Sequence, residues 1–334
     1  MWSVRQNGVV TDIRCETATE FVSVLDPLVG PFSQPAHLGL YVFRGVTSEQ
    51  HDLLPAAFRQ LTALLDRSEW VHPPLPTIGE QCEAEIETLQ KFFDIAARQG
   101  LRLPEDSQSL RAQLEDWAGR FFHATAETPV VWPPRELLSL IALAQHYGVP
   151  TRALDWTWSS LTATYFAIRD VRTEQDSNIA VWVFSYFMKA FDRFMTSLYP
   201  EDRPLILFTA PGADNDNLRA QRGLFMSQVH SVTDRNAPFQ PTSYERLLSK
   251  SVPSATRVPL AFRVIVPSRE APHIRWFLSS AGTTAGSLFP GFWGAAREFQ
   301  EERLTIRRDA LSPSTEFSNA VQRAIIDAFK SADA

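Results

Sequence analysis

The sequence is poor in cysteine and has no long apolar run. Only Cys15 and Cys82 among its 334 residues are cysteines, and their separation fits no metal-binding spacing. A disulfide scaffold and a cysteine-based zinc site are therefore not expected, and a reducing compartment, the cytoplasm, is predicted. No stretch of about 18 or more apolar residues occurs, so neither a transmembrane helix nor a membrane partner is predicted. The first residues lack the basic and apolar regions of a signal peptide.

Lysine is also scarce. Only four of the 32 basic residues are lysine, so 28 are arginine, against 38 acidic residues and a net charge of −6. This acidic balance argues against non-specific attraction to phosphate backbones. Arginine binds phosphate and carboxylate groups through a planar, bidentate fork that lysine lacks. A bias of the source genome explains most of the excess, so only the arginines inside specific motifs are candidates for binding an anion.

Several motifs that carry well-defined chemistry are absent. The chain contains no Gly-x-Gly-x-x-Gly, no Walker loop, no Gly-x-Ser-x-Gly and no His-Glu-x-x-His. Neither His72 nor His123 has another histidine at the spacing of a helical metal site. The sequence therefore predicts no metal site.

The periodicity of the apolar residues predicts an α+β fold with a mixed β-sheet core. Helical spacing dominates the chain between residues 48 and 170, whereas β-branched and aromatic runs appear mainly after residue 178. An early strand must pair with the late strands, so one unit with a helical insertion after the first strand is expected. The predicted helices are 48–66, 83–98, 107–123, 135–147, 161–168, 290–304 and 316–328, and the predicted strands are 38–43, 151–157, 179–184, 205–208 and 260–266.

The first candidate cluster is Phe43-Arg44-Gly45, at the end of the first predicted strand. An arginine that follows a buried strand lies at the mouth of that strand, and a neighbouring glycine lets a ligand or another backbone approach closely. A guanidinium in this position suits a carboxylate or a pyrophosphate. The alternative is a structural ion pair with an internal acid.

The second cluster spans residues 144–157 and is dense in groups that bind or transfer protons. His146 ends a predicted helix, where the helix dipole favours the protonated imidazole. Arg152 and Asp155 face opposite sides of a regular strand, so they need not pair with each other. Ser159 or its neighbour can cap the helix that follows. The alternative is a structural network of satisfied polar groups.

The third cluster spans residues 218–225, where Gln221 stands before Gly223 and an apolar step. A polar residue in this position is typical of the edge of a strand near a site. Alone, the pattern is weak evidence for a functional residue.

Together, the clusters resemble the FRG-domain family, which is named for a Phe/Tyr-Arg-Gly motif near its start. Phe43-Arg44-Gly45 matches that motif, and residues 144–157 match the long central motif. The central motif leads into a helix that ends in Tyr165-Phe166-Ala167, as it does here. Residues 220–225 and 288–291 resemble two later motifs of the family.

This resemblance implies boundaries and a biological setting. An FRG-type α+β domain is expected over residues 38–300, with a helical insertion at about 48–130. Residues 1–37 then form an N-terminal segment and residues 301–334 a helical C-terminal extension. FRG proteins resemble accessory, toxin-like or antiphage components of bacteria, which agrees with a cytoplasmic chain.

A second and looser resemblance is to mono-ADP-ribosyltransferases. Those enzymes place Arg or His at the end of a first strand, lead a second strand into a helix, and carry Glu, Asp or Gln at a later strand. Arg44, the Asp155–Ser159 segment and Gln221 look like these three elements in the same order. The resemblance implies an ADP-ribosyltransferase-like sheet with NAD as substrate, and cleavage of the nicotinamide glycosidic bond through an oxocarbenium-like state.

The same resemblance implies roles for individual residues. The expected catalytic residues are Arg44, His146, Asp155 and Gln221, and the expected NAD-binding residues are Arg44, Gly45, Arg152, Thr157 and Ser159. The arginines anchor the pyrophosphate or ribose, the hydroxyls hold the ribose, and Asp155 or His146 acts on the acceptor. Gln221 can orient a ribose hydroxyl, but an amide cannot be a general base.

Two other functions stay open at this point. A non-catalytic module can bind a nucleotide or an anionic partner in the same cleft, which Gln221 and the arginine excess favour. A nuclease or hydrolase can use His146, Arg152 and Asp155. The acceptor, whether protein or nucleic acid, and the oligomeric state do not follow from the sequence.

Overall fold

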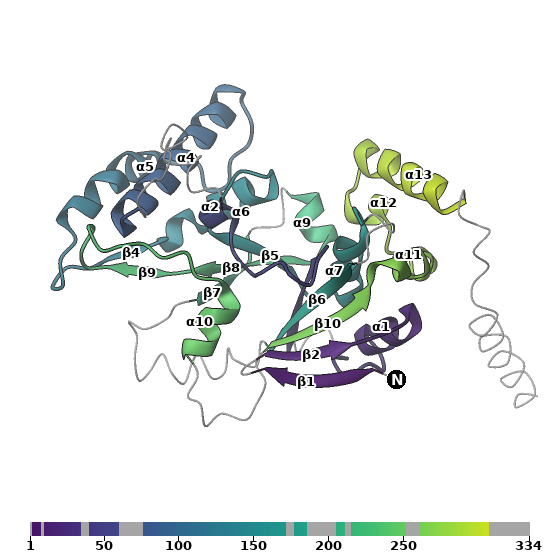
Figure 1. Cartoon of the computed structure of the whole chain (residues 1–334). Helices are drawn as coiled ribbons and strands as arrows, with labels where there is room; N and C mark the ends of the chain where they lie inside the picture. Colours follow the sequence, from purple (N-terminus) through teal and green to yellow (C-terminus); the bar gives the residue numbers. More distant parts are fainter. Residues whose placement is uncertain are drawn as a thin grey trace, which may run out of the picture.

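An eight-stranded sheet forms the centre of the molecule, in the order β1-β2-β10-β6-β3-β5-β8-β7 (Figure 1). A computed structural model describes residues 2–7, 10–34, 40–59, 76–171, 177–185, 205–210, 215–251 and 261–306. The strands are β1 (Ser3–Asn7), β2 (Val10–Arg14), β3 (Tyr41–Val46), β4 (Val130–Trp132), β5 (Ala153–Thr157), β6 (Asn178–Ser185), β7 (Leu205–Phe208), β8 (Gly223–Gln228), β9 (His230–Val232) and β10 (Ala261–Pro267). β4 and β9 form a separate two-stranded sheet.

Helices surround both sheets. They are α1 (Ala18–Leu25), α2 (Ala56–Arg59), α4 (Ile78–Arg98), α5 (Gln108–Arg120), α6 (Leu138–His146), α7 (Ser160–Ile168), α9 (Asp216–Ala220), α10 (Tyr244–Ser251), α11 (Ala271–Ser280), α12 (Ala285–Leu288) and α13 (Phe292–Ile306), with short 3₁₀ turns at Phe121–His123, Arg135–Leu137 and Ser268–Glu270. The fold is therefore α+β with a mixed, largely antiparallel sheet, because β10 pairs in parallel with β2 and the other described ladders are antiparallel. None of the described helices has both the length and the apolar character needed to cross a bilayer.

The strands predicted after residue 150 are confirmed, but the first predicted strand is the third in the chain. β1 and β2 precede it, and β2 pairs with β10 inside the main sheet. Thus residues before 38 contribute two strands and α1 to the sheet and its cover. Residues 3–6 of β1 are all exposed. The sequence of this strand therefore shows no alternation of apolar and polar residues that would predict it.

The helix predicted over residues 48–66 is wrong in its described part. Residues 48–55 form turns, and a helix, α2, begins only at Ala56. Pro55 accounts for this start, because proline disfavours helical backbone at the residue before it. Residues 60–66 lie outside the described residues, as does the helix predicted at 316–328. The remaining predicted helices are confirmed, and α4 begins five residues earlier than expected, after a capping box at Thr77.

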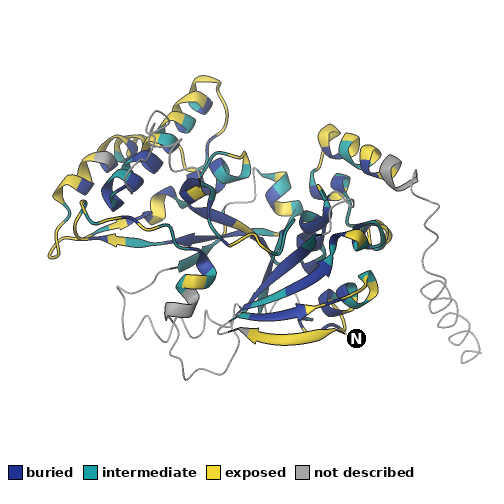
Figure 2. Ribbon diagram, viewed as in Figure 1, coloured by how far each residue is buried: buried dark blue, intermediate teal, exposed yellow. Residues whose placement is uncertain are grey.

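Three apolar cores hold these layers together. Figure 2 shows that the central strands of the main sheet are largely buried, whereas β1 at its edge is exposed. One lies between the sheet and helices α1, α7 and α11, and a second lies on the opposite face under α10. The third fills the helical part made of α2, α4, α5 and α6, which the chain forms between β3 and β5. β5 and β8 run from the main sheet to this helical part (Figure 1).

Two features of β3 position the candidate site. β3 pairs with β6 over six residues, but it pairs with β5 only at Phe43 and Thr157. The two strands therefore separate beyond that single pair. α7 packs directly against β3 at Gly45, where a Cβ atom would lie 2.0 Å from the carbonyl oxygen of Ala163 and 2.5 Å from the nitrogen of Ala167. Only glycine permits this close approach of two backbones.

Candidate functional site

A cleft of about 570 Å³ opens beside the separated ends of β3 and β5. Its volume is within the usual range for small-molecule sites. Six of the eight residues that the sequence motifs singled out line it, namely Arg44, Gly45, His146, Asp155, Thr157 and Gln221. They come from β3, α6, β5 and the turn before β8, which are far apart in the sequence. Arg152 and Ser159 are not part of its lining.

Arg44 spans the gap between the two strands. Its NH1 donates a hydrogen bond to the backbone carbonyl of Asp155 at 2.5 Å and lies 3.7 Å from the carboxylate oxygen Oδ2. The expectation that Arg44 follows its strand is wrong, because β3 continues to Val46 and Arg44 lies inside it opposite Trp182 of β6. No other hydrogen bond of this guanidinium is made among the described residues, so its remaining N–H groups can receive an anion.

The carboxylate of Asp155 is oriented by a hydrogen bond from Gln145 and is accessible to solvent. Its side chain is 51% exposed. Gln145 donates from Nε2 to Oδ2 of Asp155 at 3.0 Å, and the hydroxyl of Thr151 donates to Oε1 of Gln145 at 2.7 Å. The buried Thr151 thereby fixes the orientation of the Gln145 amide, which fixes the Asp155 carboxylate. Gln145 lies within the central motif, residues 144–157, but the sequence alone indicates no role for it.

His146 lies at the last position of α6 and lines the same cleft. Burial holds the pKa of this imidazole below its ordinary value, and the nearby Asp155 carboxylate only partly opposes that effect. The expectation that the helix dipole keeps His146 protonated is therefore wrong, because desolvation disfavours the charged ring. A neutral imidazole accepts a proton on one nitrogen only, and Nε2 of His146 lies 3.3 Å from the side-chain amide nitrogen of Asn217.

Thr157 and Gln221 are linked through the backbone. The buried hydroxyl of Thr157 donates to the carbonyl oxygen of Gln221 at 2.6 Å and accepts from the backbone N–H of Ser159 at 3.0 Å. The Gln221 amide donates from Nε2 to the carbonyl of Leu288 at 3.2 Å. Ser159 itself caps α7, since its hydroxyl accepts from the N–H of Thr162. Thr157 and Ser159 therefore join and cap secondary structure elements, and Ser159 has no place in the cleft.

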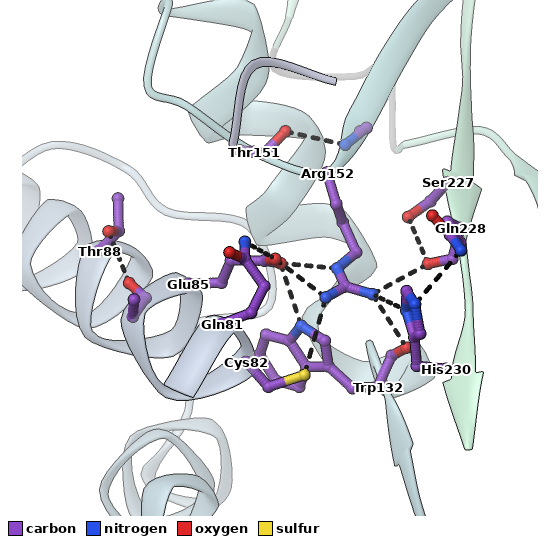
Figure 3. A network of polar contacts seen from close by, with 12 residues as sticks. Gln81, Cys82, Glu85, Thr88, Trp132, Thr151, Arg152, Ser227, Gln228 and His230 are labelled. Carbon is purple, nitrogen blue, oxygen red and sulfur yellow. Dashed lines mark hydrogen bonds and ion pairs between the residues drawn. The ribbon is translucent and has the colours of Figure 1, made fainter. Parts of the chain in front are cut away.

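Arg152, the second predicted anchor, lies in a buried network away from the cleft (Figure 3). The residue is 1% exposed. Its Nε and NH2 donate to the two carboxylate oxygens of Glu85 at 2.6 and 2.9 Å. Its NH1 contacts the carbonyls of Trp132 and Gln228 and lies 3.0 Å from Nδ1 of His230. The prediction that Arg152 binds the cofactor is wrong, because its donors already have protein partners.

This network joins the helical part to the sheet. Glu85 comes from α4, Trp132 from β4 and His230 from β9, whereas Arg152 immediately precedes β5. Burial and the adjacent Arg152 cation lower the pKa of His230 to about 3, so the imidazole is neutral. Arg152 can only donate, so Nδ1 of His230 accepts, while Nε2 of the same ring lies 3.2 Å from the side-chain amide nitrogen of Gln228. His146 and Asp155 line the cleft but Arg152 does not, so this geometry argues against a hydrolase that uses all three residues together.

Other residues of the cleft were missed from the sequence. His51 and Asp52, in the turn after β3, and Arg59 at the end of α2 line its wall. These residues belong to the segment predicted as one long helix, which gave no reason to place them at a site. Phe166 and Phe289 form an aromatic part of the wall, with ring centroids 6.0 Å apart. Across the described ranges, no group of three or more His, Cys, Asp or Glu is arranged to hold a metal ion.

Comparison with known protein families agrees with the sequence motifs. Residues 39–176 match the family model of the FRG domain. This match includes the Phe-Arg-Gly motif and the whole central motif, and thus supports the resemblance to the FRG-domain family. Gln221 and Phe289 lie outside the matched residues and reach the cleft through the fold. Neither the curated proteins nor the solved structures contained a match to the chain.

Proposed function

We propose that the cleft binds NAD and that the protein transfers the ADP-ribose group of NAD to an acceptor, as an effector of bacterial toxin or antiphage type. The observation that carries this proposal is the meeting of Arg44, Asp155 and Gln221 in one cleft. These three residues come from the three elements that the looser resemblance aligned with ADP-ribosyltransferases. The three residues lie far apart in the sequence, and their convergence in one cleft supports the proposal.

The arrangement of the sheet gives the proposal further support. β3 carries Arg44, β5 leads through Ser159 into α7, and Gln221 stands two residues before the start of β8. The gap between β3 and β5 leaves room for an extended ligand next to the one arginine that crosses it. We interpret this order as an ADP-ribosyltransferase-like arrangement within the α+β sheet.

The proposed reaction exchanges one substituent at C1′ of the ribose next to nicotinamide. The C1′–N bond breaks and its electron pair stays on the nicotinamide nitrogen, which becomes neutral. An oxygen lone pair of the acceptor forms the new C1′–O bond, and the acceptor proton passes to a base. Asp155 and His146 line the cleft, and we assign the role of this base to one of them.

Other cleft residues serve binding and charge stabilisation in this scheme. Arg44 binds the pyrophosphate while its bond to the Asp155 carbonyl holds the guanidinium in place. The carboxylate of Asp155 stabilises the positive charge that develops on the ribose. Gln221 keeps Oε1 as an acceptor for a ribose hydroxyl, because its Nε2 already donates to Leu288.

Incubation of the full chain with NAD labelled in its adenosine part tests the proposal. We expect release of nicotinamide and transfer of label to protein, to nucleic acid or to water. Asp155→Asn should abolish this turnover, and Arg44→Ala should abolish both turnover and NAD binding. Arg5→Ala is a matched loss of one exposed arginine on β1, four strands away from β3, and should behave like the wild type. Absence of NAD binding and of nicotinamide release in the wild type would reject the proposal.

A second function, a non-catalytic nucleotide-binding module, is favoured by one observation. At the position that corresponds to the Glu, Asp or Gln of ADP-ribosyltransferases, this chain has Gln221. Its amide can form hydrogen bonds but cannot accept a proton as a base. Calorimetry with NAD separates the two functions. Binding that Arg44→Ala removes, without any release of nicotinamide, supports the binding module and excludes the transferase.

A further inference from the structure

We propose that Arg59 and Arg44 together hold two linked phosphate groups, and that the ligand of the cleft is a nucleoside diphosphate bearing a sugar. This inference rests on the proposed function only for the location of the site, and it adds a residue that no sequence motif marked.

Hydrogen bonds and packing hold the backbone around Arg59 in place. α2 is short, but the N–H of Ala57 donates to the carbonyl of Thr151 at 3.1 Å, and the N–H of Arg59 donates to the carbonyl of Pro55 at 3.2 Å. The buried ring of Phe58 packs edge-on against Phe239, with centroids 5.1 Å apart. The base of the Arg59 side chain is thus positioned, whereas the residue itself is exposed and lines the cleft.

Arg59 differs from the other arginines of the cleft in its partners. Arg169 pairs with Asp170 at 2.9 Å, and Arg44 bonds to Asp155. For Arg59, no ion pair or side-chain hydrogen bond is found among the residues that the structure describes. The Arg59 charge is also close enough to Arg44 to contribute to lowering the pKa of that guanidinium, after the larger effect of burial. Two cations that face one cleft and repel each other are stabilised by an anion between them.

The remaining polar groups indicate what the anion is attached to. The carboxylates of Asp52 and Asp155 line the same cleft as the two arginines. A carboxylate accepts hydrogen bonds from sugar hydroxyls but repels a phosphate, so these acids and the arginines suit different parts of one ligand. Each guanidinium can bind one phosphate through two parallel hydrogen bonds. A sugar joined through a pyrophosphate to a nucleoside, as in ADP-ribose, satisfies both kinds of group.

Calorimetry on the full chain tests this inference with three probes: ADP-ribose, ADP and AMP. The variants are Arg59→Ala, Arg59→Lys and, as a matched loss of an exposed arginine, Arg5→Ala. We expect Arg59→Ala to weaken ADP-ribose and ADP about ten- to hundredfold and AMP no more than about threefold, because AMP offers a single phosphate. Arg59→Lys should restore part of the affinity, since it keeps the charge but not the planar fork. The melting temperature of each variant should equal that of the wild type.

The outcomes separate the two proposals. If Arg59→Ala binds ADP-ribose as tightly as Arg5→Ala does, or if AMP and ADP lose affinity equally, the two-arginine site is refuted. Failure of the wild type to bind any of the three probes also refutes it. If ADP-ribose binds in an Arg59-dependent manner but NAD releases no nicotinamide, the diphosphate site stands and the transferase proposal fails.

Discussion

The guanidinium of Arg152 and the carboxylate of Glu85 form a two-bonded ion pair inside the protein, at 2.6 and 2.9 Å. Both side chains are almost completely buried. Removal of one partner leaves an uncompensated charge in the interior, which costs about 3–5 kcal/mol of stability. Arg152→Ala should therefore lower the free energy of unfolding by about this amount, measured by urea denaturation. The exposed pair of Arg120 and Asp116 provides the control, and Arg120→Ala should cost less than about 1 kcal/mol. A cost for Arg152→Ala as small as that of the control would contradict the structural role of the network.

The neutral His230 beside Arg152 should make stability depend on pH. Its pKa is about 3 in the folded protein and about 6.5 in an unfolded chain, so the unfolded state binds the extra proton between these values. The free energy of unfolding should therefore fall as the pH decreases below about 6.5, by up to about 2 kcal/mol at pH 5 from this group. Urea denaturation at pH 7.5 and pH 5 measures the change. His230→Gln should show a smaller decrease than the wild type, and an equal decrease would contradict the prediction.

Close contact between α7 and β3 predicts that Gly45 tolerates no side chain. A Cβ atom there would meet backbone atoms of Ala163 and Ala167, which cannot rotate away. Gly45→Ala should therefore destabilise the protein by about 3 kcal/mol or more. Gly119 in α5 is the matched control, because a Cβ atom there meets nothing within 4 Å. Gly119→Ala should raise stability by up to about 1 kcal/mol, since alanine favours a helix. Thermal denaturation should show the two melting temperatures moving in opposite directions.

Orientation of Asp155 by Gln145 and Thr151 predicts a selective effect on turnover. Thr151→Val removes the donor to Gln145 and should reduce nicotinamide release by up to about a hundredfold, because misplacement of a reacting group raises the barrier. Affinity for ADP-ribose should fall less than turnover does, since this hydroxyl is not part of the cleft lining and acts on Asp155 only through Gln145. Thr151→Ser retains the hydroxyl and should keep the activity of the wild type. Equal turnover in the valine and serine variants would show that the hydrogen bond has no positioning role.

Of the eight strands in the main sheet, the sequence predicted five, namely β3, β5, β6, β7 and β10, and six of its eight candidate site residues line the cleft. Buried strands such as β6 and β10 carry continuous apolar runs, which can be recognised without knowledge of their partners. The motif residues Arg44, Asp155 and Gln221 line one cleft, as expected. Arg44 lies in β3, Asp155 lies in β5 and Gln221 lies just before β8, and these three strands belong to one sheet. In contrast, β1 escaped notice because its described side chains are exposed and follow no alternation.

The local sequence could not show which of the two motif arginines lines the cleft and which is buried. Arg44 and Arg152 each stand in a specific motif, but one lines the cleft and the other is buried with Glu85, which is 67 residues away. Only the long-range fold reveals that partner. A signal was nevertheless present, since a glutamate on the apolar face of the predicted helix 83–98 indicates a buried cation nearby. The protonation of His146 was mistaken for a similar reason, because the extent of its burial depends on tertiary contacts.

The single paired position between β3 and β5 divides the eight-stranded sheet mechanically into two blocks. One block contains β1, β2, β10, β6 and β3, and the other contains β5, β8 and β7. Within each block the strands share extended ladders, whereas β3 is linked to β5 by the Phe43–Thr157 pair and by the contacts of Arg44 with the carbonyl and the carboxylate of Asp155. A rotation of one block against the other would alter the width of the cleft and spare the other ladders. Arg44, the residue proposed to bind the pyrophosphate, therefore also connects the two halves of the sheet.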